Sequence, residues 1–126
     1  MSSPDTSSPA AALPLISVIV RSMDRPSLVA ALASIAAQDA SPVEVVLVNA
    51  LGPAHGPVPT AAGAHPLHRI DAGRPLPRSA AANAGLDAAQ GRWVIFLDDD
   101  DVYLPGHLSR LAAALAARPA AVAAYA

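Results

Sequence analysis

The chain has 126 residues, a length typical of one domain, and 53% of them are hydrophobic although only 3% are aromatic. Its net charge of −2 disfavours a nucleic-acid partner held through the phosphate backbone, and its lack of cysteine excludes disulfides and thiolate zinc sites. The apolar run Leu13–Val20 is too short to span a membrane and lacks the basic flank of a signal peptide. We therefore expect a cytoplasmic protein without a transmembrane segment, either free or peripheral at the inner face of the membrane.

The first half of the chain predicts a strand, a helix and a second strand. Residues 1–13 are rich in Ser, Pro and Ala and are predicted to be a disordered leader. The apolar run Leu15–Val20 predicts a buried strand, leucines at helical spacing predict a helix over Ser27–Gln38, and Val43–Val48 predicts the second strand. A strand–helix–strand unit of this size favours a right-handed crossover and parallel pairing.

The middle of the chain is dominated by residues that break regular structure. Asn49–Pro66 is rich in glycine and proline and is predicted to be a loop without a regular element. A short strand is expected at Leu67–Ile70 and another loop at Asp71–Pro77. The alanine-rich segment Arg78–Gln90 predicts a helix, which Gly91 is well placed to end.

An apolar strand running into an acidic cluster is the most informative part of the chain. The five bulky apolar residues Trp93–Leu97 predict a strand buried on both faces, and Asp98–Asp101 follow it directly. Pro105 begins a third predicted helix, which Arg118 ends, and Ala120–Ala126 resembles the start of another strand. The pattern predicts an α/β domain with a mostly parallel sheet that stops short of its natural end.

The position of the acidic cluster predicts a metal site. Ligands of open α/β sheets bind at the carboxyl ends of the strands. Side chains at i and i+2 of an extended chain share a face, so Asp98 and Asp100 can converge on one cation while Asp99 points away. Hard oxygen ligands suit Mg²⁺ or Mn²⁺, which can bridge a diphosphate and stabilise a leaving group. A solvated acidic turn is the alternative.

Other catalytic frameworks lack their motifs. The chain contains no Rossmann or P-loop glycine signature and no G-x-S-x-G sequence. Ser17 is predicted to be a tolerated small strand residue rather than a nucleophile. The four histidines, His55, His65, His68 and His107, show no metal-ligand spacing on a common element. The three of them that lie in or beside the loop-rich segment are expected to be solvated.

Taken together, these segments resemble the family 2 glycosyltransferases. The likeness covers residues 14–126, including both early strands and Arg25-Pro26. It is most specific in the N-A-G-L sequence at Asn83–Leu86 and the F-L-D-D-D-D sequence at Phe96–Asp101. The resemblance implies a GT-A fold, which is a Rossmann-like α/β arrangement, and transfer of a sugar from a nucleotide-diphosphate donor. It further implies that residues 14–126 form the donor-binding portion, with the acceptor half missing.

The resemblance also implies roles for individual residues. Asp98-Asp99-Asp100 would be the D-x-D element, with Asp100 as the main ligand of Mn²⁺ or Mg²⁺. Asp98 would lie on the metal or the donor ribose, and Asp101 would support them. The implied donor-binding residues are Val20, Arg21, Asn49, Arg78, Asn83, Asp98 and Asp99. The general base of the family lies in the second half of its domain, so no residue here is assigned that role.

The chain departs from the family pattern at three places. Residues 21–25 read Arg-Ser-Met-Asp-Arg where the family usually has P-x-Y-N-R. Asn49-Ala50 replaces an Asp pair, one member of which meets the nucleobase; an asparagine can still hydrogen-bond a base edge, without charge. Ala82 replaces an arginine, whose place at the diphosphate Arg78 or Arg74 can take.

Three functions remain open from the sequence. The first is a metal-assisted glycosyltransferase that uses a UDP-, GDP- or dTDP-sugar and a glycan, lipid or small-molecule acceptor. The second is a non-catalytic nucleotide-sugar-binding or regulatory module. The third is another metal-dependent α/β protein, although the chain lacks the glycine-rich loop of a nucleotidyltransferase and the acid pattern of a receiver domain. A homo-oligomer is also open, because alanine-rich helices can bury their faces against a partner.

Overall fold

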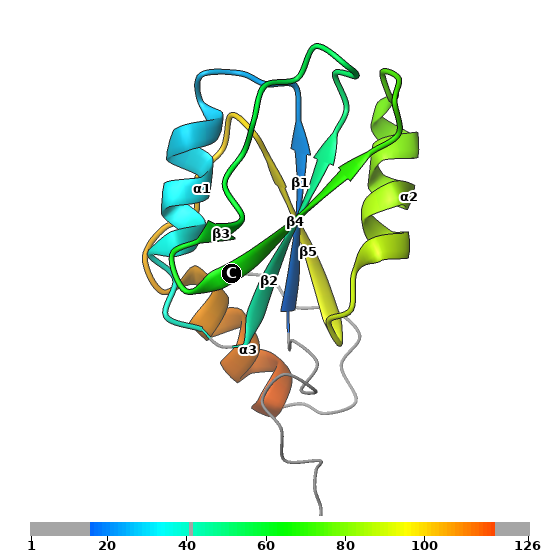
Figure 1. Ribbon diagram of the computed structural model, residues 1–126. Coiled ribbons are helices and arrows are strands. Elements are labelled where there is room, and N and C mark those ends of the chain that lie inside the picture. The colour runs from blue at the N-terminus through cyan, green and yellow to red at the C-terminus, as the bar shows by residue number, and fades with distance from the viewer. Residues whose placement is uncertain (1–15, 41, 118–126) are drawn as a thin grey trace, which may run out of the picture.

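The computed structural model describes residues 16–40 and 42–117, which form a five-stranded sheet between two layers of helices (Figure 1). The strand order across the sheet is β3-β4-β2-β1-β5. The elements are β1 (Ile16–Ser22), α1 (Leu28–Ala36), β2 (Val43–Asn49), β3 (Ala61–Ala62), β4 (His65–Asp71), α2 (Arg78–Ala88), β5 (Trp93–Asp98) and α3 (His107–Ala117). The predicted leader and the predicted strand at 120–126 lie outside the described residues.

The sheet is mostly parallel, as predicted. β1 pairs in parallel with β2 on one side and with β5 on the other, β2 pairs in parallel with β4, and only the short β3 is antiparallel to its neighbour. Helices α1 and α2 return the chain to the starting end of the sheet before β2 and β5, whereas β2 reaches β4 through a loop and β3. All four parallel strands therefore end at one edge.

Apolar side chains fill both faces of the sheet. Alternate residues of β1 point to opposite faces, so Val18 and Val20 pack under α1 and α3 while Ile19 packs under α2. Figure 1 shows α1 and α3 on one side of the sheet and α2 on the other. β1 and β2 are buried on both faces, which is why their sequences read as continuous apolar runs. No helix in the described part of the chain is both long and apolar enough to cross a membrane.

Buried polar side chains fix the connections between these layers. Glu44 is 2% exposed and accepts hydrogen bonds from Ser17 Oγ (2.5 Å) and the Gln90 N–H (2.7 Å). The Gly91 N–H in turn donates to Ser17 Oγ (2.8 Å). Ser17 is thus a buried hydrogen-bonding residue of the strand and ties the start of β5 to β1. At the other face, Gln38 Oε1 accepts from the Leu108 N–H (2.9 Å) and caps the first turn of α3.

Two sequence predictions about strands are wrong. β5 lies at the edge of the sheet rather than buried on both faces, and Val94 and Phe96 are 41% and 51% exposed. The apolar residues of a strand show that the strand can be buried. They do not determine whether it lies in the middle of the sheet or at its lateral edge. The segment predicted to lack regular elements contains β3, whose residues Ala61 and Ala62 pair with the start of β4 around Gly63, at a φ of 60°.

The predicted helices are present with shorter bounds. α1 and α2 end before the predicted Gln38 and Gln90, and α3 begins at His107 rather than at Pro105. Leu104, which continues the leucine spacing of α3 in the sequence, lies before the helix and is 69% exposed.

The glycine of the N-A-G-L sequence allows α2 to approach the sheet. A Cβ at Gly85 would lie 2.4 Å from Ile19 Cγ2, closer than side chains pack. We predict that Gly85→Ala lowers the free energy of unfolding by about 1–2 kcal/mol, because so short a contact places the overpacking cost at about 2–3 kcal/mol, the upper part of its usual range, and alanine recovers about 1 kcal/mol of helix propensity. Urea unfolding followed by circular dichroism measures this change.

The exposed Asp87 on the same helix supplies the control for this substitution. Asp87→Ala is expected to change stability by less than about 0.5 kcal/mol. A Gly85→Ala protein as stable as the wild type would show that α2 does not depend on this close approach.

Candidate functional site

Polar residues meet at the end of the sheet where the parallel strands stop. We call this end the acidic edge, as distinct from the lateral edge that β5 forms. The last residues of β1, β2, β4 and β5 are Ser22, Asn49, Asp71 and Asp98. The register places Asn49 between Ser22 and Asp71, and it places Arg21 beside Asp98. Ligands of open α/β sheets bind at this edge.

Three of the four consecutive acids converge. Carboxylate oxygens of Asp98, Asp100 and Asp101 lie within 4.8 Å of one another. A hydrogen bond from the Asp101 N–H to the Asp98 carbonyl (3.0 Å) closes the turn. Ligand sets made only of oxygen suit Mg²⁺ and Mn²⁺, and three carboxylates leave positions for water or substrate oxygens. The residues present therefore fit a divalent cation.

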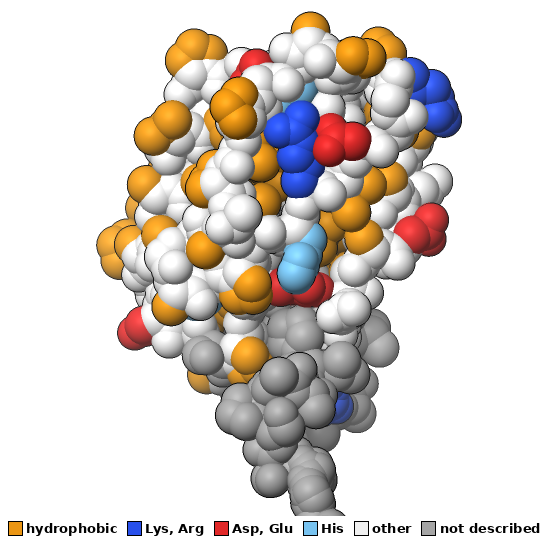
Figure 2. Space-filling view, in the orientation of Figure 1, with side chains coloured by type: hydrophobic (Ala, Val, Ile, Leu, Met, Phe, Trp, Pro, Cys, Tyr) orange, Lys and Arg blue, Asp and Glu red, His pale blue; other side chains and the backbone are white. Residues whose placement is uncertain are grey.

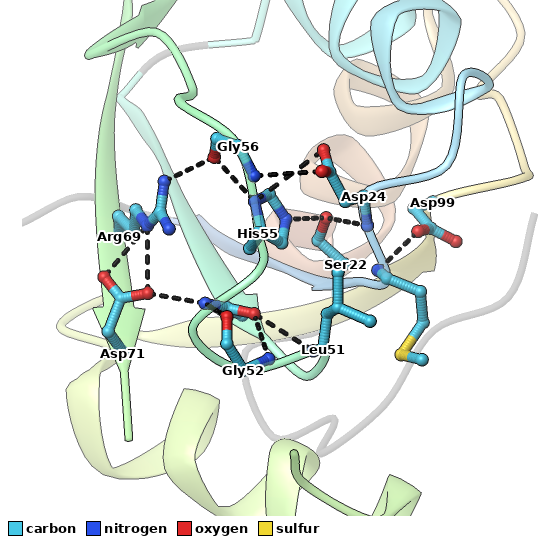
Figure 3. A network of polar contacts seen from close by, with 11 residues as sticks. Ser22, Asp24, Leu51, Gly52, His55, Gly56, Arg69, Asp71 and Asp99 are labelled. Atoms are coloured by element: carbon cyan, nitrogen blue, oxygen red, sulfur yellow. Dashed lines mark hydrogen bonds and ion pairs between the residues drawn. The ribbon is translucent and has the colours of Figure 1, made fainter. Parts of the chain in front are cut away.

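The fourth acid, Asp99, has the opposite environment. It is 1% exposed, and its Oδ2 accepts a hydrogen bond from the Met23 N–H (2.7 Å; Figure 3). Its carbonyl accepts from Ser27 Oγ (2.7 Å), and Arg25 Nη1 lies 3.6 Å from its Oδ1. Asp99 thus binds the loop between β1 and α1, and its side chain is turned away from the three converging carboxylates.

Two arginines pair with the exposed acids. Arg25 Nη1 lies 3.1 Å from Asp100 Oδ2, and Arg78 Nη1 lies 3.2 Å from Asp98 Oδ2. All four side chains are at least 40% exposed. Ion pairs with this exposure contribute about 0–1 kcal/mol, so a metal or phosphate can replace either partner at little cost.

The implied donor-binding residues fall into different environments. Arg21, Arg78 and Asp98 line one cavity on the α2 side of the sheet. Val20 is fully buried under α1 and α3, so it can offer a ligand only its backbone. Asn83 is exposed on α2 and does not line that cavity.

Asn49 directs all of its amide hydrogen bonds inward. Its Nδ2 donates to Asp71 Oδ1 (2.7 Å) and the Gly52 carbonyl (2.9 Å), and its Oδ1 accepts from the N–H groups of Leu51 and Gly52 (Figure 3). The residue is 3% exposed. Its two donors and two acceptor sites are therefore used to shape the loop after β2.

His55 joins this loop to the end of β1. Its Nδ1 lies 2.7 Å from the Gly56 carbonyl and its Nε2 lies 2.7 Å from Ser22 Oγ. A carbonyl only accepts, so Nδ1 carries a hydrogen and donates it to Gly56, and Nε2 pairs with the Ser22 hydroxyl. Asp24, at a φ of 59°, donates its N–H to the same Oγ and accepts from the Gly56 N–H (Figure 3).

The prediction that the histidines of this segment are solvated is wrong for two of them. His55 and His65 are 7% and 6% exposed, and His65 Nε2 lies 2.9 Å from the Gln38 carbonyl. Ser22 lies 33 residues from His55 in sequence, and Gln38 lies 27 residues from His65, so no local pattern reports these contacts. Sequence reasoning also missed Ser22, Asp24 and Arg69 as members of the network at this edge.

Figure 2 shows one face of the molecule with few charged side chains and no broad basic patch among its described residues. Arg69 and Asp71 form one oppositely charged pair, in which Arg69 Nε lies 2.9 Å from Asp71 Oδ2. Arg69 also donates to the Gly56 carbonyl (2.8 Å) and so links β4 to the loop after β2.

The different environments of neighbouring acids generate a prediction. Asp99→Ala leaves the Met23 N–H without its acceptor, so we expect the free energy of unfolding to fall by about 1–3 kcal/mol. Asp100→Ala removes only an exposed ion pair and reduces repulsion within the acidic run, so we expect a change below about 1 kcal/mol. Urea unfolding of both variants tests the contrast, and equal effects would contradict it.

Asp71 generates a prediction about pH. The hydrogen bond from the Asn49 amide and the nearby Arg69 guanidinium hold the pKa of Asp71 below its usual value, although burial acts in the opposite direction. A lowered pKa in the folded state stabilises the fold above the unfolded pKa of about 3.9, and this contribution is lost as the pH falls further. The stability difference between wild type and Asp71→Asn should therefore be larger at neutral pH than in acid. A difference independent of pH would argue against the network.

Comparisons with known proteins show which family the chain belongs to. A profile described as Glycosyl transferase family 2 matches residues 17–126. The chain is 34% identical over 98 residues to the uncharacterized glycosyltransferase YwdF of Bacillus subtilis (strain 168), covering 77% of this chain and 37% of that protein. It is 38% identical over 86 residues to the succinoglycan biosynthesis protein ExoO of Rhizobium meliloti (strain 1021), covering 68% of this chain and 25% of that protein.

Solved structures show the same fold. The crystal structure of S. aureus TarS 1-349 superposes with a TM-score of 0.69 at 23% identity, over 82% of this chain and 33% of that one. Its complex with UDP-GlcNAc gives a TM-score of 0.67 at 22% identity, over 82% of this chain and 32% of that one. These likenesses confirm the expected GT-A α/β arrangement. The chain spans 25% to 37% of the curated relatives, and its profile match shows that it belongs to glycosyl transferase family 2.

Proposed function

We propose that this chain is the nucleotide-sugar-binding portion of a metal-dependent glycosyltransferase, which transfers a sugar from a nucleotide-diphosphate donor to an acceptor. The observation that carries the proposal is the convergence of Asp98, Asp100 and Asp101 at the carboxyl edge of the sheet. Membership of family 2 and the UDP-GlcNAc complex of a structural neighbour support a nucleotide sugar as the ligand.

Each acid has a distinct part in this proposal. Asp98, Asp100 and Asp101 would hold Mn²⁺ or Mg²⁺, and Asp98 would also be within reach of the donor ribose. The metal, when bound, supplies Lewis-acid stabilisation of the charge that develops on the diphosphate leaving group. Asp99 acts as a positioning residue, because it fixes the loop after β1 against the acidic turn.

Arginines complete the proposed donor site. Arg25 and Arg78 rest on Asp100 and Asp98, and a metal on those carboxylates would release both guanidinium groups. Guanidinium groups bind phosphate oxygens with two parallel hydrogen bonds. We propose that the released arginines turn to the donor. The acceptor would be a glycan, lipid or small molecule met on the cytoplasmic side, and no residue of this chain is assigned as the general base.

A non-catalytic nucleotide-sugar-binding module is the second candidate. The observation that favours it is Asn49, whose amide is fully used by the loop after β2 and by Asp71 of β4 and cannot meet a nucleobase without breaking those bonds. Metal-dependent hydrolysis of the donor would separate the candidates, because only a catalytic site transfers the sugar to water.

Calorimetric titration of UDP and GDP, with and without Mn²⁺, tests the donor site. We predict that Mn²⁺ tightens the binding of one nucleotide by about tenfold or more, and that Asp100→Asn abolishes this tightening because it removes a ligand of the cation. The nucleotide whose affinity responds to the metal would identify the donor.

Asp87→Asn provides a matched control, because it makes the same charge change at an exposed position of α2. This variant should keep the full response to Mn²⁺. Nucleotide binding without any metal response, in a chain shown to be folded, would make the acidic run a surface turn and favour the binding module.

A further inference from the structure

The segment that leaves the acidic edge is held against the C-terminal end of α1 by two polar side chains. Ser34 Oγ accepts a hydrogen bond from the Tyr103 N–H (3.0 Å). Gln38 Nε2 donates to the Leu104 carbonyl (3.0 Å), and Gln38 Oε1 accepts from the Leu108 N–H (2.9 Å). The partners of these bonds lie 66 to 70 residues apart in sequence, so the end of α1 determines the path of the chain between β5 and α3.

Both side chains are fixed in the orientation that these contacts need. Gln38 is 3% exposed, and the second hydrogen of its Nε2 goes to the Ser34 carbonyl (3.1 Å). Turning this amide over would place Nε2 against the Leu108 N–H, donor against donor. Ser34 Oγ donates its own hydrogen to the Ala31 carbonyl (2.7 Å), so its lone pairs are left for the Tyr103 N–H.

The burial of apolar side chains does not by itself hold this segment. Tyr103 packs against the core, but Val102 and Leu104 are 56% and 69% exposed. The segment also lies between β5 and α3 and belongs to neither, so regular structure does not supply partners for its N–H and C=O groups. The two side chains at the end of α1 therefore supply contacts that burial and regular structure do not.

These contacts lie next to the candidate metal ligands. Asp101 is two residues before Tyr103, and Asp99 is held by its hydrogen bonds to the loop before α1. Asp100 and Asp101 thus lie between two fixed points of the main chain. Their carboxylates and that of Asp98 come within 4.8 Å of one another. Like charges at this separation repel, so the main chain must hold the three acids together before a cation binds.

We propose that Ser34 and Gln38 are positioning residues of the candidate metal site. By fixing the main chain just after Asp101, they keep Asp100 and Asp101 converged with Asp98. They touch neither the metal nor the donor, and they act through the main chain that carries the ligands. The inference rests on the proposed function for the presence of a metal, and on the hydrogen bonds of α1 alone for the geometry of the three acids.

The first test needs no metal. The Asp101 N–H donates to the Asp98 carbonyl (3.0 Å), so its hydrogen-exchange rate reports the opening of the turn that carries the acids. In Ser34→Ala we expect this rate to rise about fivefold or more, the change expected for the loss of one hydrogen bond. The amide of Val45, in the fully buried strand β2, reports global unfolding. Faster exchange at Val45 with an unchanged rate at Asp101 would show a merely structural role and overturn the proposal, as would unchanged rates at both.

The second test measures the affinity of the folded chain for Mn²⁺, from the electron paramagnetic resonance signal of the free ion. Ser34→Ala and Gln38→Ala should each weaken this affinity by about tenfold or more, as the loss of groups behind metal ligands usually does. Ser34→Thr should restore both the affinity and the exchange rate of Asp101, because a threonine hydroxyl can make the same bond to the carbonyl three residues earlier. Variants that bind Mn²⁺ as tightly as the wild type would overturn the proposal. If Gln38→Ala does not fold, the Ser34 variants decide.

Matched controls and a comparison with nucleotide binding complete the design. Ser79→Ala removes an exposed hydroxyl of α2, and Gln90→Ala removes an exposed amide from the loop before β5. Both should leave the Mn²⁺ affinity and the exchange rate of Asp101 unchanged. If the wild type binds no Mn²⁺ but exchange at Asp101 still accelerates in Ser34→Ala, the proposed metal-dependent function fails and the positioning of the acids stands. Nucleotide binding with the same response to Mn²⁺ in Ser34→Ala as in the wild type would support the proposed function and overturn the positioning role.

Discussion

The buried carboxylate of Asp99 is the contact on which the acidic edge depends. The carboxylate accepts a hydrogen bond from the Met23 N–H, and the main-chain carbonyl of Asp99 accepts one from the Ser27 hydroxyl. The residue that follows β5 therefore holds the loop that leads into α1. Because one acid of the run is committed inward, its neighbours Asp98 and Asp100 face outward and come together with Asp101. Of the four consecutive acids, Asp99 thus has a structural role, and the other three form the candidate metal site.

Small residues determine the shape of the space around this edge. With 3% aromatic residues, the chain cannot fill the layer between helix and sheet with large side chains. It brings the backbones close instead, as Gly85 does over Ile19. The wall of the cavity on the side of α2 is also made of small residues, Ala81 and Ala82. Small side chains on α2 therefore explain both the close packing at Gly85 and the open space one turn before it.

Much of the fold could be predicted because its determinants are local. The apolar runs of β1 and β2, the leucine spacing of the helices and the breakers between them each act within about ten residues, and parallel pairing follows from the strand–helix–strand order. The exposed face of β5 could not be predicted, because its place at the edge depends on which strands lie beside it. The convergence of Asp98 and Asp100 could be predicted because the two-residue period of an extended chain is also local.

The rest of the site depends on contacts between distant segments. Asn49 was expected to offer its amide to a ligand, but its position in the register opposite Asp71, 22 residues away, supplies an internal partner. No spacing in the sequence predicts that His55 is buried. Its burial depends on the contact with Ser22, the last residue of β1. Arg21 looks in the sequence like any arginine near the end of a strand, and only the structure shows that its Nε is buried without a hydrogen-bond partner among the described residues. Polar groups at strand ends are therefore predictable as a set, whereas the direction of each side chain is not.

The charges at this edge couple the two proposed ligands to each other. Around the acidic run itself, four acids, Asp98 to Asp101, lie near three arginines, Arg21, Arg25 and Arg78, which leaves one net negative charge in this part of the edge. A divalent cation alone would make this part positive, and a diphosphate alone would make it more negative. Each ligand therefore offsets the charge that the other brings, and the metal must raise diphosphate affinity by the same factor as the diphosphate raises metal affinity. An edge built in this way would hold either ligand weakly and both together well, which would suit the release of the nucleotide after the transfer proposed above.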